Sequence, residues 1–311
     1  MNNYNFPKSW HLSVQTIQEL GILLKTDPNT LKSTAKSSGK RYRQIPIKGR
    51  ILSVPNNSLK IIQSTILKEL LDFEFPPYVH GGIKRRSIIT NATSHQCKEW
   101  VVCFDIRKFF PSVHLSKIKR ALLELKCSEE VIRTLSHLTT YNFQLPQGAP
   151  TSPALANLVL FRLDSRISKL CKIHKYSYSR FFDDLTISGN KDPKVLLRKI
   201  KDIIKQEGYL LNKNPKKLRI QNSSAEQVVT GIIVNEKTLR IPKATLNQIK
   251  VLLTKLAQGL LPIEGVENPL KLQESIKGKI DFLSMVDPAL KKPLLTLWNG
   301  VDWGLYGSSL N

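Results

Sequence analysis

The sequence predicts an α+β protein, and three observations carry that prediction. Residues 41–54 and 176–188 are expected to form β-hairpins, because aromatic and β-branched residues alternate with polar ones on either side of a turn. A short apolar run at 100–106 has the composition of a strand that is buried on both faces. Apolar residues at helical spacing occur through much of the remaining chain, and residues 243–311 are expected to be mostly helical.

The first part of the chain is expected to combine short helices with a hairpin. Segments 13–24 and 29–36 have helical patterns, and nothing in them indicates chemistry. The hairpin at 41–54 turns between Lys48 and Arg50, so its tip carries two cations. This hairpin is therefore expected to project positive charge.

The most informative stretch contains two adjacent acids, Asp183 and Asp184, at the tip of the second hairpin. Carboxylates about 4 Å apart repel by roughly 4 kcal/mol at an effective dielectric near 20, so a site that gathers them usually holds a cation. Mg²⁺ prefers such oxygen ligands. The alternative is an Asp-Asp turn stabilised by local hydrogen bonds. Asp105 is the single acid of the predicted buried strand, and a buried acid needs a structural or chemical reason.

Several further elements are expected between and after these acids. Residues 115–139 and 154–167 have helical patterns, and the turn-rich loop at 145–153 leads into the second helix. Residues 228–234 are expected to form one strand, in which Gly231 would permit a close approach of another backbone.

The charge balance indicates a polyanionic partner. The 311 residues include 48 Lys and Arg against 24 Asp and Glu, a formal charge of +24 spread along the chain. Such an excess favours nucleic acid over the alternative of an ordinary solvated basic surface. The stretch at 80–87 joins two glycines, which let a backbone approach closely, to three cations that suit phosphate, namely Lys84, Arg85 and Arg86. His95 is expected to be a structural hydrogen-bonding residue rather than a catalytic base.

The cysteines and the hydropathy indicate where in the cell the protein is expected to be. Cys97, Cys103, Cys127 and Cys171 lack paired spacing and zinc-type partners, so they are expected to be reduced thiols in a cytoplasmic protein. No apolar run reaches the roughly 18 residues needed to cross a bilayer, and the first residues lack an apolar signal core. The sequence therefore predicts a soluble, cytoplasmic protein without a membrane partner.

Four motifs in their order resemble those of reverse transcriptases. They are F-D-I-R-K-F-F-P-S at 104–112, L-P-Q-G-A-P-T-S-P-A-L-A-N at 145–157, F-F-D-D-L-T-I-S at 181–188 and N-P-K-K at 214–217. Each motif alone is weak, and their order carries the resemblance. Within the family, N-A-T-S-H at 91–95 and V-T-G at 229–231 resemble two segments of bacterial retron reverse transcriptases. Most retron enzymes have Y-A-D-D where this chain has F-F-D-D, a departure expected to affect primer placement or fidelity.

The resemblance implies a right-hand polymerase with fingers, an antiparallel-sheet palm and a helical thumb. Residues 1–98 would form N-terminal helices and fingers, residues 99–238 the palm with a helical fingers insertion at about 112–145, and residues 239–311 the thumb. The implied reaction is RNA-directed DNA synthesis from deoxynucleoside triphosphates with two Mg²⁺ ions.

A retron enzyme would copy a cognate structured non-coding RNA. Priming would start from a 2′-hydroxyl of a guanosine in that RNA and give a branched RNA–DNA hybrid, msDNA. An effector protein and a role in phage defence are further implied. The alternatives are an abortive-infection or intron-type reverse transcriptase, or a non-catalytic RNA-binding scaffold of polymerase shape, against which the intact acids argue.

The resemblance also implies roles at the reaction centre. Asp105, Asp183 and Asp184 match the acids that hold the two metal ions, with the backbone carbonyl of Ile106 as a further ligand. Lys217 matches the lysine proposed to protonate the leaving pyrophosphate.

The remaining implied roles concern the nucleotide and the nucleic acid. Phe110 matches the aromatic gate that excludes a 2′-hydroxyl, and plain core packing is its alternative. The residues that would bind the incoming nucleotide are Gln147 and Gly148 in its pocket and Lys48 and Arg50 at its triphosphate. The residues that would contact nucleic acid are Lys84, Arg85, Arg86, Asn91, His95, Thr230 and Gly231.

Overall fold

The computed structural model describes residues 12–47, 49–212, 214, 217–260 and 269–306, and the chain divides into two compact units. The first unit comprises Met1–Ser87 and Trp100–Ile220, and the second comprises Ile88–Glu99 and Gln221–Asn311. Each unit is therefore discontinuous in sequence.

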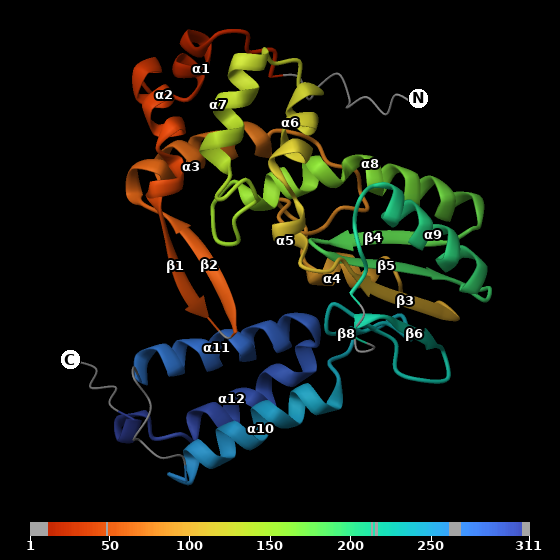
Figure 1. Ribbon diagram of the computed structural model, residues 1–311. Coiled ribbons are helices and arrows are strands. Elements are labelled where there is room, and N and C mark those ends of the chain that lie inside the picture. Colours follow the sequence, from red (N-terminus) through yellow and green to blue (C-terminus); the bar gives the residue numbers. More distant parts are fainter. Residues whose placement is uncertain (1–11, 48, 213, 215–216, 261–268, 307–311) are drawn as a thin grey trace. The chain divides into compact units, whose positions relative to one another are not determined.

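One part of the first unit is a layer of helices (Figure 1). The helices of this layer are α1 (Ile17–Leu23), α2 (Pro28–Lys36), η2 (Ser38–Arg41), α3 (Asn57–Leu71), α6 (Leu115–Leu123), α7 (Glu129–Thr139) and α8 (Ser152–Ile173). The helical character predicted over 115–139 is confirmed, but it is divided between two helices. Lys126 has a left-handed φ of 60°, which ends the first helix, and the Ser128 hydroxyl caps α7 by accepting from the Val131 N–H.

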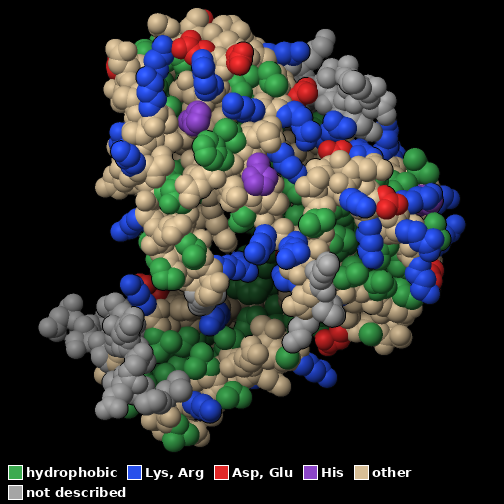
Figure 2. Space-filling model, in the orientation of Figure 1, with side chains coloured by type: hydrophobic (Ala, Val, Ile, Leu, Met, Phe, Trp, Pro, Cys, Tyr) green, Lys and Arg blue, Asp and Glu red, His purple; other side chains and the backbone are tan. Residues whose placement is uncertain are grey.

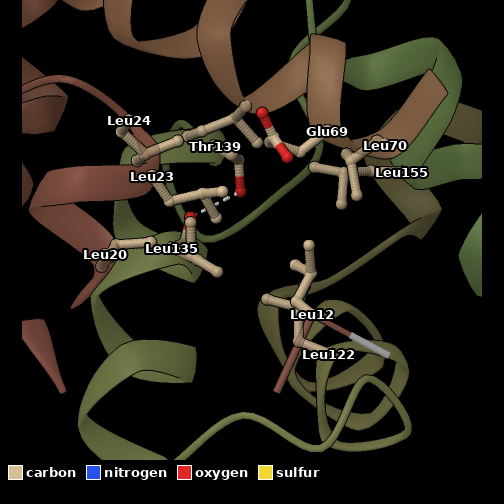
Figure 3. Close-up of a pocket in the computed structure, with 11 residues that line it drawn as sticks. Leu12, Leu20, Leu23, Leu24, Glu69, Leu70, Leu122, Leu135, Thr139 and Leu155 are labelled. Carbon is tan, nitrogen blue, oxygen red and sulfur yellow. Dashed lines mark hydrogen bonds between the residues drawn. The ribbon is translucent and has the colours of Figure 1, made fainter. Parts of the chain in front are cut away.

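Leucine side chains from these helices form the core of the helical layer, as Figure 3 shows around a small internal gap. The gap measures about 10 Å³, close to the smallest volume that holds one water molecule. The Thr139 hydroxyl in its wall already donates to the Leu135 carbonyl at 2.8 Å. The gap is therefore a packing defect of an apolar core and not a ligand site.

The first unit also contains most of a four-stranded sheet with strand order β4-β5-β3-β6. Its strands are β3 (Trp100–Asp105), β4 (Ser177–Phe181), β5 (Asp184–Gly189) and β6 (Arg219–Asn222), and β5 pairs antiparallel with both β3 and β4. Helix α8 packs on β4, and α9 (Lys194–Gln206) lies beside α8 on the same face (Figure 1). This arrangement confirms the predicted α+β class, the second hairpin and the buried strand.

The first hairpin, β1 (Tyr42–Ile47) and β2 (Arg50–Pro55), is confirmed as well. Gly49 in its turn has a φ of 74°, which glycine adopts at little cost. The Ser53 N–H in β2 donates to the Gln147 carbonyl at 2.8 Å, so the hairpin base is joined to the predicted turn-rich loop.

The second unit combines a small hairpin with helices. Its elements are α4 (Ile88–Thr93), β7 (Val228–Val229), β8 (Ile232–Ile233), α10 (Lys243–Ala257), α11 (Pro269–Val286), η4 (Pro288–Leu290), α12 (Lys291–Asn299) and η5 (Trp303–Tyr306). The single strand predicted over 228–234 is wrong, because Thr230 and Gly231 have positive φ and turn the chain back on itself. A Cβ atom on Gly231 would meet nothing within 4 Å, so the glycine serves the turn and not a close backbone approach.

Within the described residues, no helix is both long and apolar enough to cross a membrane.

Candidate active site

Strand pairing brings the three predicted acids to one end of the sheet. Asp105 ends β3 and faces Asp184, the first residue of β5, in the antiparallel register. Asp183 lies in the two-residue turn between β4 and β5, and its carbonyl accepts from the Ile106 N–H at 3.1 Å. Residues far apart in the sequence therefore meet because β3 and β5 are neighbours.

Asp105 is 6% exposed, and both of its carboxylate oxygens have partners. Lys217 Nζ donates to Oδ2 at 3.0 Å, and Asn212 Nδ2 donates to Oδ1 at 3.0 Å. The Asn212 N–H also donates to the Asp105 carbonyl at 2.9 Å. The hydrogen bond from Lys217 raises the pKa of this lysine, which keeps it protonated at neutral pH. No motif in the sequence singles out Asn212, which sequence reasoning missed.

Burial and, after it, the charges of neighbouring acids raise the pKa values of Asp183 and Asp184. Removal from solvent, followed by the charge of Asp105, raises the pKa of Asp183 above its usual range. Partial removal from solvent and the charges of Asp183 and Asp105 raise the pKa of Asp184 to about 6. Arg50 at the tip of the first hairpin acts in the opposite direction on Asp183. A cation placed among these acids would relieve the repulsion.

The chemistry of this donor set fits a divalent metal. Three carboxylates and a backbone carbonyl are the hard oxygen ligands that Mg²⁺ prefers. Among the described residues, however, no three His, Cys, Asp or Glu side chains converge as a preformed metal cluster. The Lys217 ammonium group instead holds positive charge against Asp105. Metal binding would thus require Asp105 to exchange or share its present partners.

The predicted nucleotide-binding residues lie in the same unit. Phe110 in α5 (Phe109–Ser112) is half-buried, with its ring centroid 5.3 Å from that of the buried Phe109. Part of the Phe110 ring is therefore accessible and part is packed. Gly148 is exposed with a φ of 116°, and a Cβ atom there would lie 3.4 Å from Leu52 Cβ in β2. Lys48 lies outside the described residues.

The predicted cationic stretch divides into exposed and structural side chains. Lys84 and Arg85 are exposed, and Figure 2 shows Lys and Arg side chains across much of one face of the molecule. Arg86 instead donates to the carbonyls of Phe75, Pro76 and Val79 at 2.5–2.8 Å. Its guanidinium group holds a loop in place, which corrects the expectation of a phosphate contact.

The retron-like segments are also partly structural. Asn91 and His95 are completely buried, so neither side chain can touch a nucleic acid. This corrects the nucleic-acid contacts expected of both residues and agrees with the structural role also expected of His95. Asn91 Nδ2 donates to Thr230 Oγ1 at 3.4 Å, and that hydroxyl donates to the Ile88 carbonyl at 3.3 Å. The two segments therefore fix α4 against the β7–β8 turn, at which Gly231 is exposed.

The fold and this site define a class of polymerase. A family model described as "Reverse transcriptase (RNA-dependent DNA polymerase)" matches residues 35–240, about two thirds of the chain. The match includes all three acids and Lys217. The chain belongs to the reverse transcriptase family.

Curated relatives narrow the class to the retron type. Retron Ec86 reverse transcriptase from Escherichia coli is 28% identical over 95% of this chain and 88% of its own length. Retron Se72 reverse transcriptase from Salmonella heidelberg is 30% identical over 80% of this chain and 69% of its own length. Retron Mx162 reverse transcriptase from Myxococcus xanthus is 30% identical over 79% of this chain, which spans only 57% of that relative.

Among solved structures, apo telomerase from Candida tropicalis is similar at 14% identity and a TM-score of 0.47, over 65% of this chain and 54% of that one.

Proposed function

We propose that this chain is an RNA-directed DNA polymerase that copies RNA into DNA from deoxynucleoside triphosphates. The observation that supports the proposal is the convergence of Asp105, Asp183 and Asp184 beside Lys217, inside the segment that matches the family. In this reaction a primer hydroxyl attacks the α-phosphate and pyrophosphate leaves, so negative charge develops on the phosphoryl group and on the leaving group.

The acids would hold the metal ions, and two basic residues would act on the phosphates. Asp105, Asp183, Asp184 and the Ile106 carbonyl would bind two Mg²⁺ ions, which lower the pKa of a hydroxyl and neutralise phosphoryl charge when bound. Arg50 would bind the triphosphate from the β1–β2 hairpin. Lys217 is protonated and close to the acids, so it would donate a proton or balance charge at the pyrophosphate.

Substrate choice would depend on the residues around the incoming sugar and base. The accessible part of the Phe110 ring would exclude a 2′-hydroxyl. Gln147 and Gly148 would shape the nucleotide pocket, because the Gln147 carbonyl fixes this loop to β2.

The likeness to retron reverse transcriptases supports a more specific proposal for the template, the primer and the product. The template would be a cognate structured non-coding RNA, priming would use a guanosine 2′-hydroxyl, and the product would be a branched RNA–DNA hybrid. Lys84, Arg85 and the turn at Thr230 and Gly231 would contact the RNA. The proposal also includes an effector protein as a partner and a role in phage defence. The four cysteines, all within the described residues, form no disulfide and three of them are buried, which suits the reducing cytoplasm.

Asp183→Asn tests the enzyme against a non-catalytic scaffold. The substitution keeps the size of the side chain but removes a charge that divalent ions require, so primer extension with Mg²⁺ should be lost. RNA affinity at the same salt concentration should be nearly unchanged, because the binding energy comes from Lys and Arg residues elsewhere. The matched control is Asp202→Asn on the exposed face of α9.

The control should extend primers as the wild type does. If Asp183→Asn still extends a primer, or if the wild type binds its own RNA tightly and never extends, the chain is an RNA-binding scaffold.

A further inference from the structure

A buried polar network lies behind the turn that carries Asp183. It contains Asn157 and Asp164 from α8 and Arg180 from β4, and none of these side chains is more than 1% exposed. Burying ionic groups is costly, and a buried ion pair is weak evidence for stability alone. The network therefore calls for an explanation in terms of geometry.

The guanidinium group of Arg180 divides its donors between two sides. Nε and Nη2 donate to the Asp164 carboxylate at 2.7–3.0 Å, which neutralises the buried charge. Nη1 donates to Asn157 Oδ1 at 3.0 Å and to the main-chain carbonyl of Phe182 at 2.9 Å. Arg180 thus ties the turn to helix α8.

The turn needs such support because its backbone is strained. Phe182 has a φ of 54°, a region that residues with a side chain seldom adopt and that persists only when the surroundings impose it. Asn157 Nδ2 also donates to the Gly81 carbonyl at 2.9 Å. A Cβ atom on Gly81 would lie 2.5 Å from the Phe182 nitrogen, so the Gly81 backbone closes the other side of the turn.

We propose that Arg180, Asn157 and Asp164 are positioning residues that fix the Phe182–Asp183 peptide, and through it the Asp183 carboxylate, for divalent-ion binding. The inference rests on the proposed polymerase function. A planar guanidinium group can bind a carboxylate and a backbone carbonyl at once, whereas a lysine ammonium group is a point charge on a flexible stem. A positive charge at residue 180 is therefore not sufficient to fix the turn, because the planar arrangement of the guanidinium donors is also needed.

Arg180→Lys and a matched control, Tyr178→Phe, test this inference. The Tyr178 hydroxyl donates to Asp164 Oδ1 at 2.6 Å, so Tyr178→Phe also removes a buried hydrogen bond but leaves the Arg180–Phe182 contact intact. Mn²⁺ binding to RNA-free protein is measured by electron paramagnetic resonance, with Asp183→Asn as the baseline for this site. Melting temperature and the Mg²⁺ dependence of primer extension are measured on the same proteins.

We expect Arg180→Lys to weaken site-specific Mn²⁺ binding about tenfold, the usual range for residues that orient metal ligands, and to raise the half-saturating Mg²⁺ concentration similarly. Tyr178→Phe should change the Mn²⁺ affinity and the half-saturating Mg²⁺ concentration by less than about twofold, although it lowers the melting temperature by a similar amount to Arg180→Lys. Asn157→Ala leaves the Arg180–Asp164 pair in place, so it supplies the same test if Arg180→Lys does not fold, and its Mn²⁺ affinity should fall in the same direction.

The positioning role is overturned if a folded Arg180→Lys or Asn157→Ala protein has wild-type Mn²⁺ affinity. It is also overturned if Tyr178→Phe weakens Mn²⁺ binding as much as these substitutions do. A wild type that binds RNA but shows neither Mn²⁺ binding above the Asp183→Asn baseline nor primer extension would refute the proposed function itself, along with the positioning role.

Discussion

Asp184→Asn should stabilise the metal-free protein. The pKa of Asp184 is about 6, because of partial burial and the carboxylates of Asp183 and Asp105, against about 3.9 in an unfolded chain. At neutral pH the folded state therefore holds an ionised group that it disfavours. The shift corresponds to roughly 3 kcal/mol. Because a substantial part of Asp184 remains accessible to solvent, screening reduces the expected gain to about 1 kcal/mol.

The assay is thermal unfolding of RNA-free protein in EDTA, where about 1 kcal/mol should raise the melting temperature by roughly 2 °C. At pH 5 the folded wild type is largely protonated at Asp184 while the unfolded chain is ionised, so the repulsion is already relieved and the difference should shrink. Added Mg²⁺ should stabilise the wild type more than the variant. A variant that is less stable than wild type in EDTA at pH 7.5, or a gap that is equal at pH 5, would refute the reasoning.

Two further predictions concern the gate and a buried histidine. Phe110→Ala should admit ribonucleotides, because it opens space beside the sugar and leaves the acids in place; an equal loss of both substrates in primer extension would identify Phe110 as core packing. Burial, with the charge of Arg86 second, lowers the pKa of His80 to about 4. The unfolded chain binds this proton near pH 6.5, so wild-type stability should fall by about 3 kcal/mol between pH 6.5 and 4 relative to His80→Gln in urea unfolding. An equal loss of stability in the wild type and in His80→Gln would contradict the assignment of this pH dependence to His80.

Local patterns predicted the elements around the site well. The alternation on both sides of Asp183 and the apolar run that ends at Asp105 follow from the two-residue period of strands, which the sequence shows directly. The break near Lys126 was missed, because neither glycine nor proline marks it and only the left-handed backbone reveals it. The turn at Thr230 was missed because an apolar run on both sides resembles one strand.

The roles of polar side chains were less predictable. A cation such as Arg86 has the same local signature whether it binds phosphate or backbone carbonyls, and its partners are set by how the loop at 75–79 folds around it. Asn91 and His95 are polar in sequence and completely buried in the structure. Burial depends on the packing of distant segments, which composition does not report.

The sequence by itself determined the chemistry, because the identity and order of Asp105, Asp183, Asp184 and Lys217 are properties of the chain that need no folding to be read. Only the tertiary structure decided which groups meet. The register of β3 against β5 places Asp105 opposite Asp184, and the packing of α8 on β4 directs Arg180 to the carbonyl of the strained turn. Contacts between distant segments depend on which elements pack together, and no local pattern specifies that choice.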